Sequence, residues 1–446
     1  MKEHLIFLSI PALRPKDVDD PAAMPNLRRL MAGGDRTELV PSFPCVTCPV
    51  QANMMTGQLP DRHGVVANGF YWREKRQVEM WTAWNPVIEA PQVWDLLHQR
   101  RPGTTSAAWF ALNIKGAGAD YICTPAPIHN PDGTEDLWCY TKPTELYGEL
   151  KAALGHFPLQ HFWGPLANIK STQWIVESAA HALKKFRPNF FYIYLPHLDY
   201  AAQKHGPDSP EAHRSLSELD ACIGRLAEGV EQAGLTGDTV LLAASEYVIT
   251  PVRGALFPNR ILRQAGLLQV RGEADHELLD FAASRAFALV DHQFAHVFVQ
   301  DPRAIDEVAQ LFRGTPGIAE VLAGNDRARY HLEHPRSGEV ILIAEPDRWL
   351  AYYWWLDDAL APPFARSVDI HRKPGYDPVE LFFDPATRSI PLDPTLVKGS
   401  HGAPATDSRS RGVVLASCAA VLPDSAQICD VEMAMIALRC FGVSGR

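Results

Sequence analysis

Short apolar runs alternate with longer stretches of helical character along most of the chain. Residues 5–10, 106–110, 190–195 and 239–244 have the composition of buried strands, and helical sequence precedes the last three. This order predicts an α/β fold with a mostly parallel central sheet flanked by helices on both faces. Because ligands bind at the carboxyl ends of such strands, the loops 9–14, 196–205 and 245–251 are the expected site.

The pattern changes in the second half of the chain, where predicted strands and one helix follow each other closely between residues 260 and 344. We therefore expect a core formed by residues 1–255 and 336–446 and an α+β insertion, or cap, at 256–335. An aromatic run at 349–355 could line a pocket, but strand packing in the core is the favoured interpretation.

Thr47 precedes a predicted apolar helix at residues 49–56, which Gly57 ends. Backbone N–H groups and the positive end of the helix dipole gather at such a terminus, so a phosphate bound there would face the Thr47 hydroxyl. The alternative interpretation is that Thr47 only caps the helix.

Composition narrows the class of partner. The chain has 446 residues, a net charge of −10 and eight cysteines. The charge provides no basic surface for a nucleic-acid polymer or an anionic membrane, although a small anionic substrate remains compatible with it. No apolar run reaches the ~20 residues of a membrane span, and residues 5–10 are too few for a signal peptide. We expect a cytoplasmic protein with reduced thiols; the sequence carries no signal for its oligomeric state.

The segment from Thr47 to Asn68 resembles the nucleophile segment of nucleotide pyrophosphatases/phosphodiesterases, a branch of the alkaline phosphatase superfamily. The positions that match in type and spacing are Thr47, Pro49, Thr56-Gly57, Pro60, His63-Gly64 and Asn68. The resemblance implies that Thr47 is transiently phosphorylated and that Asn68 donates a hydrogen bond to a phosphoryl oxygen. His63 is interpreted as a structural residue at a helix end.

The same family binds two zinc ions through carboxylates and histidines, and segments resembling its metal loops recur along this chain. The resemblance implies that Glu246 binds the ion beside Thr47, and that Asp199 and His401 bind the second ion. Three further ligand positions carry Pro11, Gln203 and Tyr247 instead of the expected aspartate and histidines. The family's ligand set is therefore incomplete.

His197 could supply a missing ligand. In an extended loop, residues i and i+2 point to the same side, so His197 and Asp199 could join His401 around one ion. The predicted cofactor is thus a divalent metal, with zinc favoured and one or two ions expected. Asp291-His292 and the pair Asp369 and His371 are interpreted as hydrogen-bonded or surface groups.

Two main functions remain open at this stage, and a transferase or isomerase on the same core is a third alternative. One is a metal-dependent phosphohydrolase or phosphodiesterase that acts on a small phosphorylated substrate through a phosphothreonine at Thr47. The other is a catalytically impaired relative that binds a phosphorylated ligand or a pathway partner, which the residues Pro11, Gln203 and Tyr247 suggest.

Overall fold

The central sheet confirms the predicted α/β architecture. In the computed structural model, which describes residues 2–129, 135–273 and 275–443, nine strands form this sheet in the order β23-β2-β22-β11-β1-β10-β5-β6-β9. The strands from β11 to β6 in this order run parallel, whereas β22 and the edge strand β9 are antiparallel to their neighbours. The strand bounds are β1 His4–Ile10, β2 Arg36–Val40, β5 Ser106–Trp109, β6 Tyr121–Pro125, β9 Cys139–Lys142, β10 Phe190–Tyr194, β11 Thr239–Ser245, β22 Gly412–Ala416 and β23 Gln427–Cys429.

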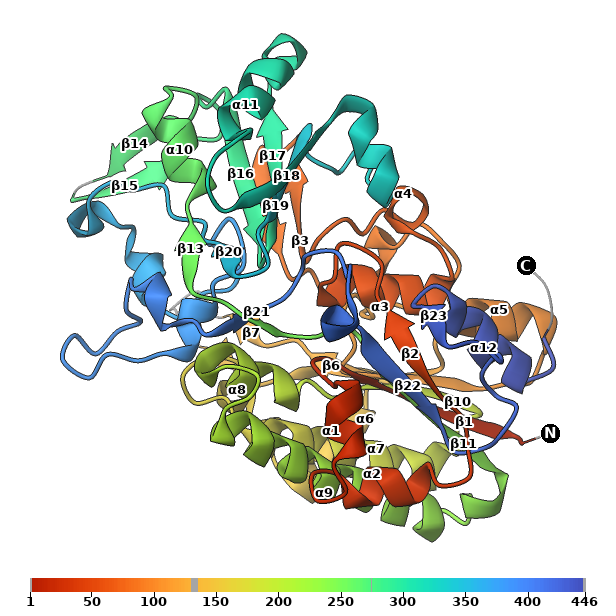
Figure 1. Cartoon of the computed structure of the whole chain (residues 1–446). Helices are drawn as coiled ribbons and strands as arrows, with labels where there is room; N and C mark the ends of the chain where they lie inside the picture. Colours follow the sequence, from red (N-terminus) through yellow and green to blue (C-terminus); the bar gives the residue numbers. More distant parts are fainter. Residues whose placement is uncertain (1, 130–134, 274, 444–446) are drawn as a thin grey trace.

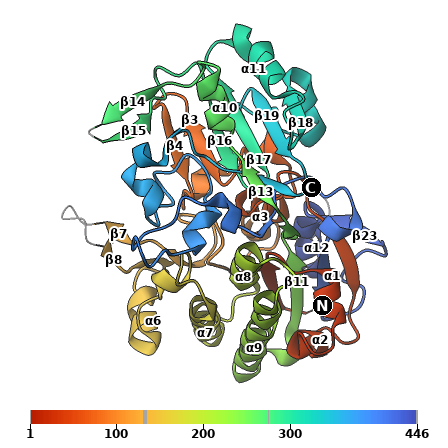
Figure 2. The same ribbon diagram turned by 60° about the vertical axis from the view of Figure 1, so that its left-hand side comes forward.

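Helices cover both faces of this sheet (Figures 1 and 2). One layer contains α2, α6, α7, α8 and α9, and the opposite layer contains α3, α5 and α12. Among the described residues, no helix is both long enough and apolar enough to cross a bilayer. The helix bounds are α1 Pro15–Asp19, α2 Pro25–Leu30, α3 Thr47–Thr56, α4 Pro60–His63, α5 Val93–Arg100, α6 Leu146–Leu154, α7 Ile169–Phe186, α8 His197–His205, α9 Pro210–Gln232, α10 Pro258–Gln264, α11 Ile305–Phe312 and α12 Glu432–Cys440.

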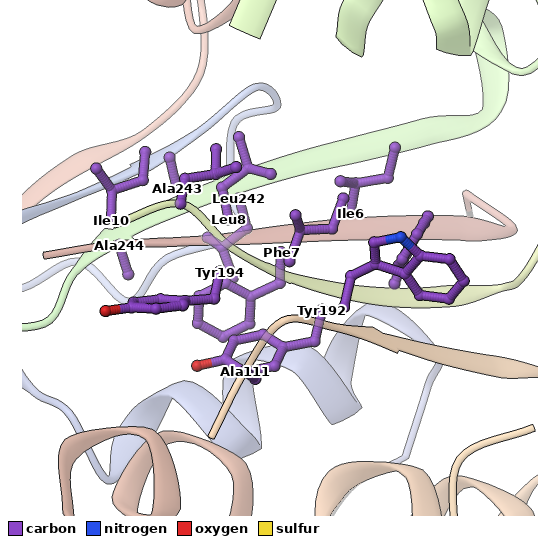
Figure 3. Close-up of a cluster of buried hydrophobic side chains, with 14 of the residues drawn as sticks. Ile6, Phe7, Leu8, Ile10, Ala111, Tyr192, Tyr194, Leu242, Ala243 and Ala244 are labelled. Atoms are coloured by element: carbon purple, nitrogen blue, oxygen red, sulfur yellow. The ribbon is translucent and has the colours of Figure 1, made fainter. Parts of the chain in front are cut away.

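The middle strands are apolar because helices bury them from both sides. Figure 3 shows side chains of β1, β10 and β11 packed together, with Phe7 and Tyr192 in edge-to-face contact. Complete burial of a side chain such as Phe7 contributes about 1.5–3 kcal/mol. In register, Ser9 lies beside Tyr194 and Ala244. The carboxyl ends of the three strands therefore coincide, which places the loops that follow them next to one another.

A second, antiparallel sheet has the order β16-β17-β19-β18 and lies above the core in Figure 1, with α10 and α11 beside it. Its strands are β16 Ala286–Asp291, β17 Phe294–Val299, β18 Ile318–Ala323 and β19 Val340–Ala344. The prediction that residues 336–446 return to the core is wrong for β19. This fully buried strand lies between β17 and β18, and a pairing at that sequence distance leaves no local signal. The aromatic run 349–355 is buried in one apolar cluster with residues of β16, β17 and β19, which agrees with its interpretation as core packing.

Within the described ranges, five short strand pairs lie outside the two larger sheets, and one of them helps to place a loop of the site. In particular, β21 pairs with β12, and an isolated bridge joins Cys45 to Gly402, so His401 lies next to the start of α3. The pairs are β3 Gly69–Trp72 with β4 Gln77–Met80, β7 Ile128–His129 with β8 Glu135–Asp136, β12 Thr250–Pro251 with β21 Gly399–Ser400, β13 Gly254–Leu256 with β20 Arg348–Leu350, and β14 Val270–Glu273 with β15 His276–Leu279.

Candidate active site

Thr47 is the first residue of α3 and faces a cleft of about 1390 Å³. Val46 occupies the N-cap position, so the interpretation of Thr47 as the helix cap is wrong. The Thr47 hydroxyl lies 3.0 Å from the hydroxyl of Tyr247. Either hydroxyl can donate in this bond. Tyr247 also lies 3.4 Å from Asp199 Oδ1, to which its hydroxyl can donate.

Glu246 follows β11 and is completely buried. Its Oε1 accepts hydrogen bonds from Ser9 Oγ and Gln51 Nε2, both at 2.7 Å. The Gln51 amide is oriented by the backbone N–H of Leu112, which donates to Gln51 Oε1 at 2.8 Å. Within the described part of the chain, Glu246 Oε2 has no hydrogen-bond partner. Burial raises the pKa of Glu246 to about 8, so the carboxyl is largely protonated at neutral pH.

Asp199 lies on α8 and is held by neutral groups. Gln203 Nε2 donates to Asp199 Oδ2 at 2.9 Å, and the hydroxyl of Tyr376 donates to Gln203 Oε1 at 2.7 Å. Burial raises the pKa of Asp199 to about 7. Gln203, which stands where the family pattern has a histidine, thus acts as a hydrogen-bond donor to this carboxylate.

Four aromatic rings form a continuous stack beside these carboxyl groups. The ring centroids of Tyr247 and His401 are 3.6 Å apart, those of His401 and His292 are 3.8 Å apart, and those of His292 and Tyr376 are 3.7 Å apart. His401 Nδ1 donates to the carbonyl of Cys45 at 2.8 Å, and His401 Nε2 has no partner among the residues that the structure describes. Burial lowers the pKa of both histidines well below the usual value, so both rings are neutral.

Asn68 holds the start of α3 in place. Its side-chain oxygen accepts the backbone N–H of Cys48 at 2.9 Å, and its amide nitrogen donates to Asp291 Oδ1 at 3.1 Å. The backbone N–H of Asn68 binds the other oxygen of Asp291 at 2.8 Å. Asn68 does not belong to the described residues that line the cleft. Its predicted bond to a phosphoryl oxygen therefore stays a prediction, whereas its role in positioning α3 is visible.

His197 lies away from Thr47, and the extended loop expected around it is wrong. Residues 197–205 form α8, in which residues i and i+2 are rotated by about 200° and so face nearly opposite sides. His197 Nε2 instead contacts Glu218 Oε2 of α9 at 2.8 Å and lines a separate cavity of about 180 Å³. The structure brings Thr47, Glu246, Asp199 and His401 together around Tyr247 and leaves His197 outside.

This donor set does not fit the two zinc ions that the family resemblance implies. A catalytic zinc ion needs about three protein ligands. Beside Thr47, Glu246 is bonded to Ser9 and Gln51, and Pro11 offers no side-chain donor. Around Asp199, the family's remaining histidine position supplies His401 Nε2, which has no hydrogen-bond partner among the described residues. The described residues contain no group of three or more His, Cys, Asp or Glu side chains arranged to hold an ion.

The cleft above Thr47 is mostly aromatic and apolar. Five large apolar side chains at its lining are 40–59% exposed, so an apolar rim surrounds it: Trp84, Ile128, Trp138, Leu166 and Val368. Lys115 is the one lysine or arginine among the described lining residues, and its ammonium lies 4.3 Å from the ring centre of Trp84. The remaining aromatic lining residues are Trp81, Phe110, Tyr140, Phe162, Trp163, Tyr194, Tyr200, Tyr247 and Tyr376. Such a lining favours an organic group with large flat or apolar surfaces.

Sequence reasoning missed three residues of this site. His292 was interpreted as a hydrogen-bonded group, and its Asp-His pair was the only available signal. It does bond to Asp291 at 2.6 Å, but its ring also lines the cleft. Tyr376 gave no signal, because a tyrosine in a loop has no local pattern that marks function. Gln51 was visible only as a departure from the family pattern, which has a histidine at this position.

The sequence profile described as type I phosphodiesterase / nucleotide pyrophosphatase matches residues 5–377. Ectonucleotide pyrophosphatase/phosphodiesterase 1 of Saccharomyces cerevisiae is 24% identical over 248 residues, which cover 53% of this chain and 31% of that protein. Family member 7 of Rattus norvegicus is 20% identical over 295 residues, covering 63% of this chain and 57% of that protein. The chain spans about half the length of the curated relatives it matches.

Solved structures share the fold over nearly the whole chain. Phosphonoacetate hydrolase from Sinorhizobium meliloti 1021, in complex with phosphonoacetate, has a TM-score of 0.65 at 16% identity, covering 98% of this chain and 96% of that one. Murine ectonucleotide pyrophosphatase/phosphodiesterase 5, in an inactive form with AMP, has a TM-score of 0.63 at 15% identity, covering 100% and 96%. At these identities the likeness establishes the fold alone, and it confirms the predicted alkaline phosphatase-like architecture.

Proposed function

Because the chain belongs to the type I phosphodiesterase/nucleotide pyrophosphatase family of hydrolases, we propose that it hydrolyses a small phosphate ester with a large apolar or aromatic organic group. The observation that carries this proposal is the Thr47 hydroxyl at the wall of a large aromatic cleft. The reacting phosphoryl group lies at Thr47, and the organic group contacts the ring-lined wall.

In this reaction Thr47 Oγ1 attacks phosphorus, and a new P–O bond forms as the bond from phosphorus to the ester oxygen breaks. The proton of Thr47 ends on the departing oxygen, so the organic group leaves as an alcohol. Water then cleaves the phosphothreonine and releases phosphate, or a phosphate monoester from a diester. The hydrogen bond between Thr47 and Tyr247 holds the Thr47 hydroxyl at the wall of the cleft. Asn68 fixes the first turn of α3 and so the position of Thr47. No step is assigned to a metal ion, since the donor set does not fit the family's pair.

Hydrolysis of aryl phosphate monoesters and diesters tests the proposal. We expect Thr47→Ala to lower kcat by at least about 10³-fold and Thr47→Ser, the matched control, to retain measurable turnover. Diesters with a naphthyl group should have a lower KM than those with a methyl group, because the larger ring fills the cleft. Equal rates for the wild type and Thr47→Ala would refute the nucleophile.

Binding without turnover is a second candidate function, and the contacts of Tyr247 with both Thr47 and Asp199 favour it. A ligand would then quench the fluorescence of Trp81 and Trp84 in the cleft while no ester is hydrolysed. Hydrolysis that depends on Thr47 excludes this function, whereas saturable quenching with no product from any ester establishes it.

We also keep a cytoplasmic location as a proposal. All eight cysteines are free thiols, including Cys45 and Cys48 of the C-x-x-C motif. Burial raises the pKa of both of these thiols, which makes them poor nucleophiles. Free, unreactive thiols are compatible with a reducing compartment. Fractionation of cells that express the full chain tests this location.

A further inference from the structure

The hydroxyl of Tyr247 lies between two side chains that the family resemblance assigns to different ions. It is 3.0 Å from Thr47 Oγ1 and 3.4 Å from Asp199 Oδ1. A zinc ion bound to either oxygen would lie about 2.0–2.2 Å from it. An ion on the Tyr247 side of either oxygen would therefore overlap the phenol oxygen, which lies 3.0 Å from one and 3.4 Å from the other. The side chain of Tyr247 therefore fills the place between the nucleophile and the second carboxylate.

The other oxygen of Asp199 is also engaged by a neutral group. Gln203 turns its amide nitrogen, which has no lone pair for a metal, toward Asp199 Oδ2 at 2.9 Å. The opposite end of the same amide accepts the hydroxyl of Tyr376 at 2.7 Å, and this bond sets which way the amide faces. Asp199 is thus satisfied by hydrogen bonds where the family would use it as a ligand.

The ring stack holds both tyrosines in these positions. His401 contacts Tyr247 on one face, at 3.6 Å between ring centres, and His292 on the other, at 3.8 Å. His292 in turn stacks on Tyr376 at 3.7 Å. All four rings are at most 5% exposed. Moving one ring would remove the packing contacts of its neighbours. The stack and the hydrogen bonds to Asp199 therefore hold Tyr247 and Gln203 in the same conformation.

From these contacts we infer that the site works without bound divalent metal, because Tyr247 and the Gln203–Tyr376 pair take the places of the family's ions. The inference adds to the proposed function, and it rests on that proposal because the proposal identifies this site as the active site. Its test, however, measures metal content and stability without any turnover, so the failure of one is distinguishable from the failure of the other.

Elemental analysis of the wild-type protein, purified without chelator or metal-affinity resin, is the first measurement. We expect substoichiometric zinc, manganese and iron, and the same Tm with EDTA, with added zinc chloride and with neither. One or more ions per chain that EDTA removes, together with a fall in Tm, would overturn the inference.

A gain-of-metal variant tests the two positions directly. Gln203→His combined with Tyr247→His should create an ion site with Asp199 and the free nitrogen of His401. We expect it to bind zinc at least about tenfold more tightly than the wild type, with a Tm that rises on zinc addition. The matched control adds Asp199→Ala to the same variant and should lose the gain.

One result of the variant experiment would contradict the inference. Zinc affinity no higher than that of the wild type, in a variant with native circular dichroism, would show that Gln203 and Tyr247 are not what excludes the ion. If the double variant does not fold, Gln203→His alone is titrated with zinc, and the wild-type metal content decides the inference in either case.

Discussion

Two buried polar networks meet the two ends of α3, and they differ in whether their hydrogen bonds are complete. The rear network joins Asn53 in the second half of the helix to His63 and Asp430. The front network joins the first half of the helix, through Thr47 and Gln51, to Tyr247 and Glu246. Both contain carboxyl groups that are wholly buried.

In the rear network every side-chain polar atom has a partner. His63 Nε2 donates to Asn53 Oδ1 at 2.7 Å, and His63 Nδ1 accepts the backbone N–H of Val65 at 3.1 Å. Asp430 accepts four hydrogen bonds, two from Ser42 and one each from Asn53 and the backbone of Val431. This complete pairing agrees with the structural role that the sequence predicted for His63.

The front network leaves Glu246 Oε2 and His401 Nε2 without partners in the described structure, and Thr47 and Tyr247 of this network line the large cleft. Unpaired buried polar atoms cost stability. Between these two networks, the one with unpaired atoms is the one that borders the cleft, although unpaired buried atoms also occur elsewhere in the described structure, as at Trp94 and Thr172.

The largest expected effect comes from making the rear network incomplete. Asp430→Asn places an amide N–H₂ group where two of the four donors now point, so at least one buried donor loses its acceptor. We expect a loss of about 3 kcal/mol in the free energy of unfolding, measured by urea denaturation. A loss under about 1 kcal/mol would contradict the structural role of this network.

The second expected effect is a pH dependence of the free energy of unfolding, which His63 of the rear network causes. Burial lowers the pKa of His63 to about 3, below its unfolded value of about 6.5. The unfolded chain therefore binds a proton that the folded chain refuses, and stability is lost as pH falls through this window. Between pH 7 and pH 5 this site alone should cost about 2 kcal/mol.

Urea denaturation at pH 7 and pH 5 measures this loss in the wild type and in His63→Gln. The amide of the variant can still donate to Asn53, but it does not titrate. A pH dependence that is unchanged in the variant would mean that His63 is not the group responsible.

The smallest expected effect is the matched change in the front network. In Glu246→Gln the amide oxygen can accept the hydrogen bonds from Ser9 and Gln51. The amide nitrogen takes the place of Oε2, to which no described residue donates a hydrogen bond in the wild type. We expect the free energy of unfolding to change by less than about 1 kcal/mol in the same urea assay. A loss as large as that of Asp430→Asn would remove the distinction between the two networks.

Much of the fold was predictable because its signals are local. The apolar runs that became β1, β5, β10 and β11, and the helix start beside Thr47, are encoded by neighbouring residues. The helix α8 was missed because Pro196 and the polar residues after it have the composition of a loop. That error placed His197 beside Asp199, although the helix turns it toward Glu218.

The sequence by itself determined the family, the mostly parallel α/β architecture of the core and the position of Thr47 at a helix start, since spacing and periodicity survive in the linear chain. The order of the strands in the sheet came from the tertiary structure. Only the tertiary structure decided what surrounds Thr47. His292, Tyr376 and His401 come from segments far apart in the chain, and their stacking with Tyr247 depends on how the second sheet packs on the core. Contacts of this kind are set by packing between distant segments, for which no local pattern exists.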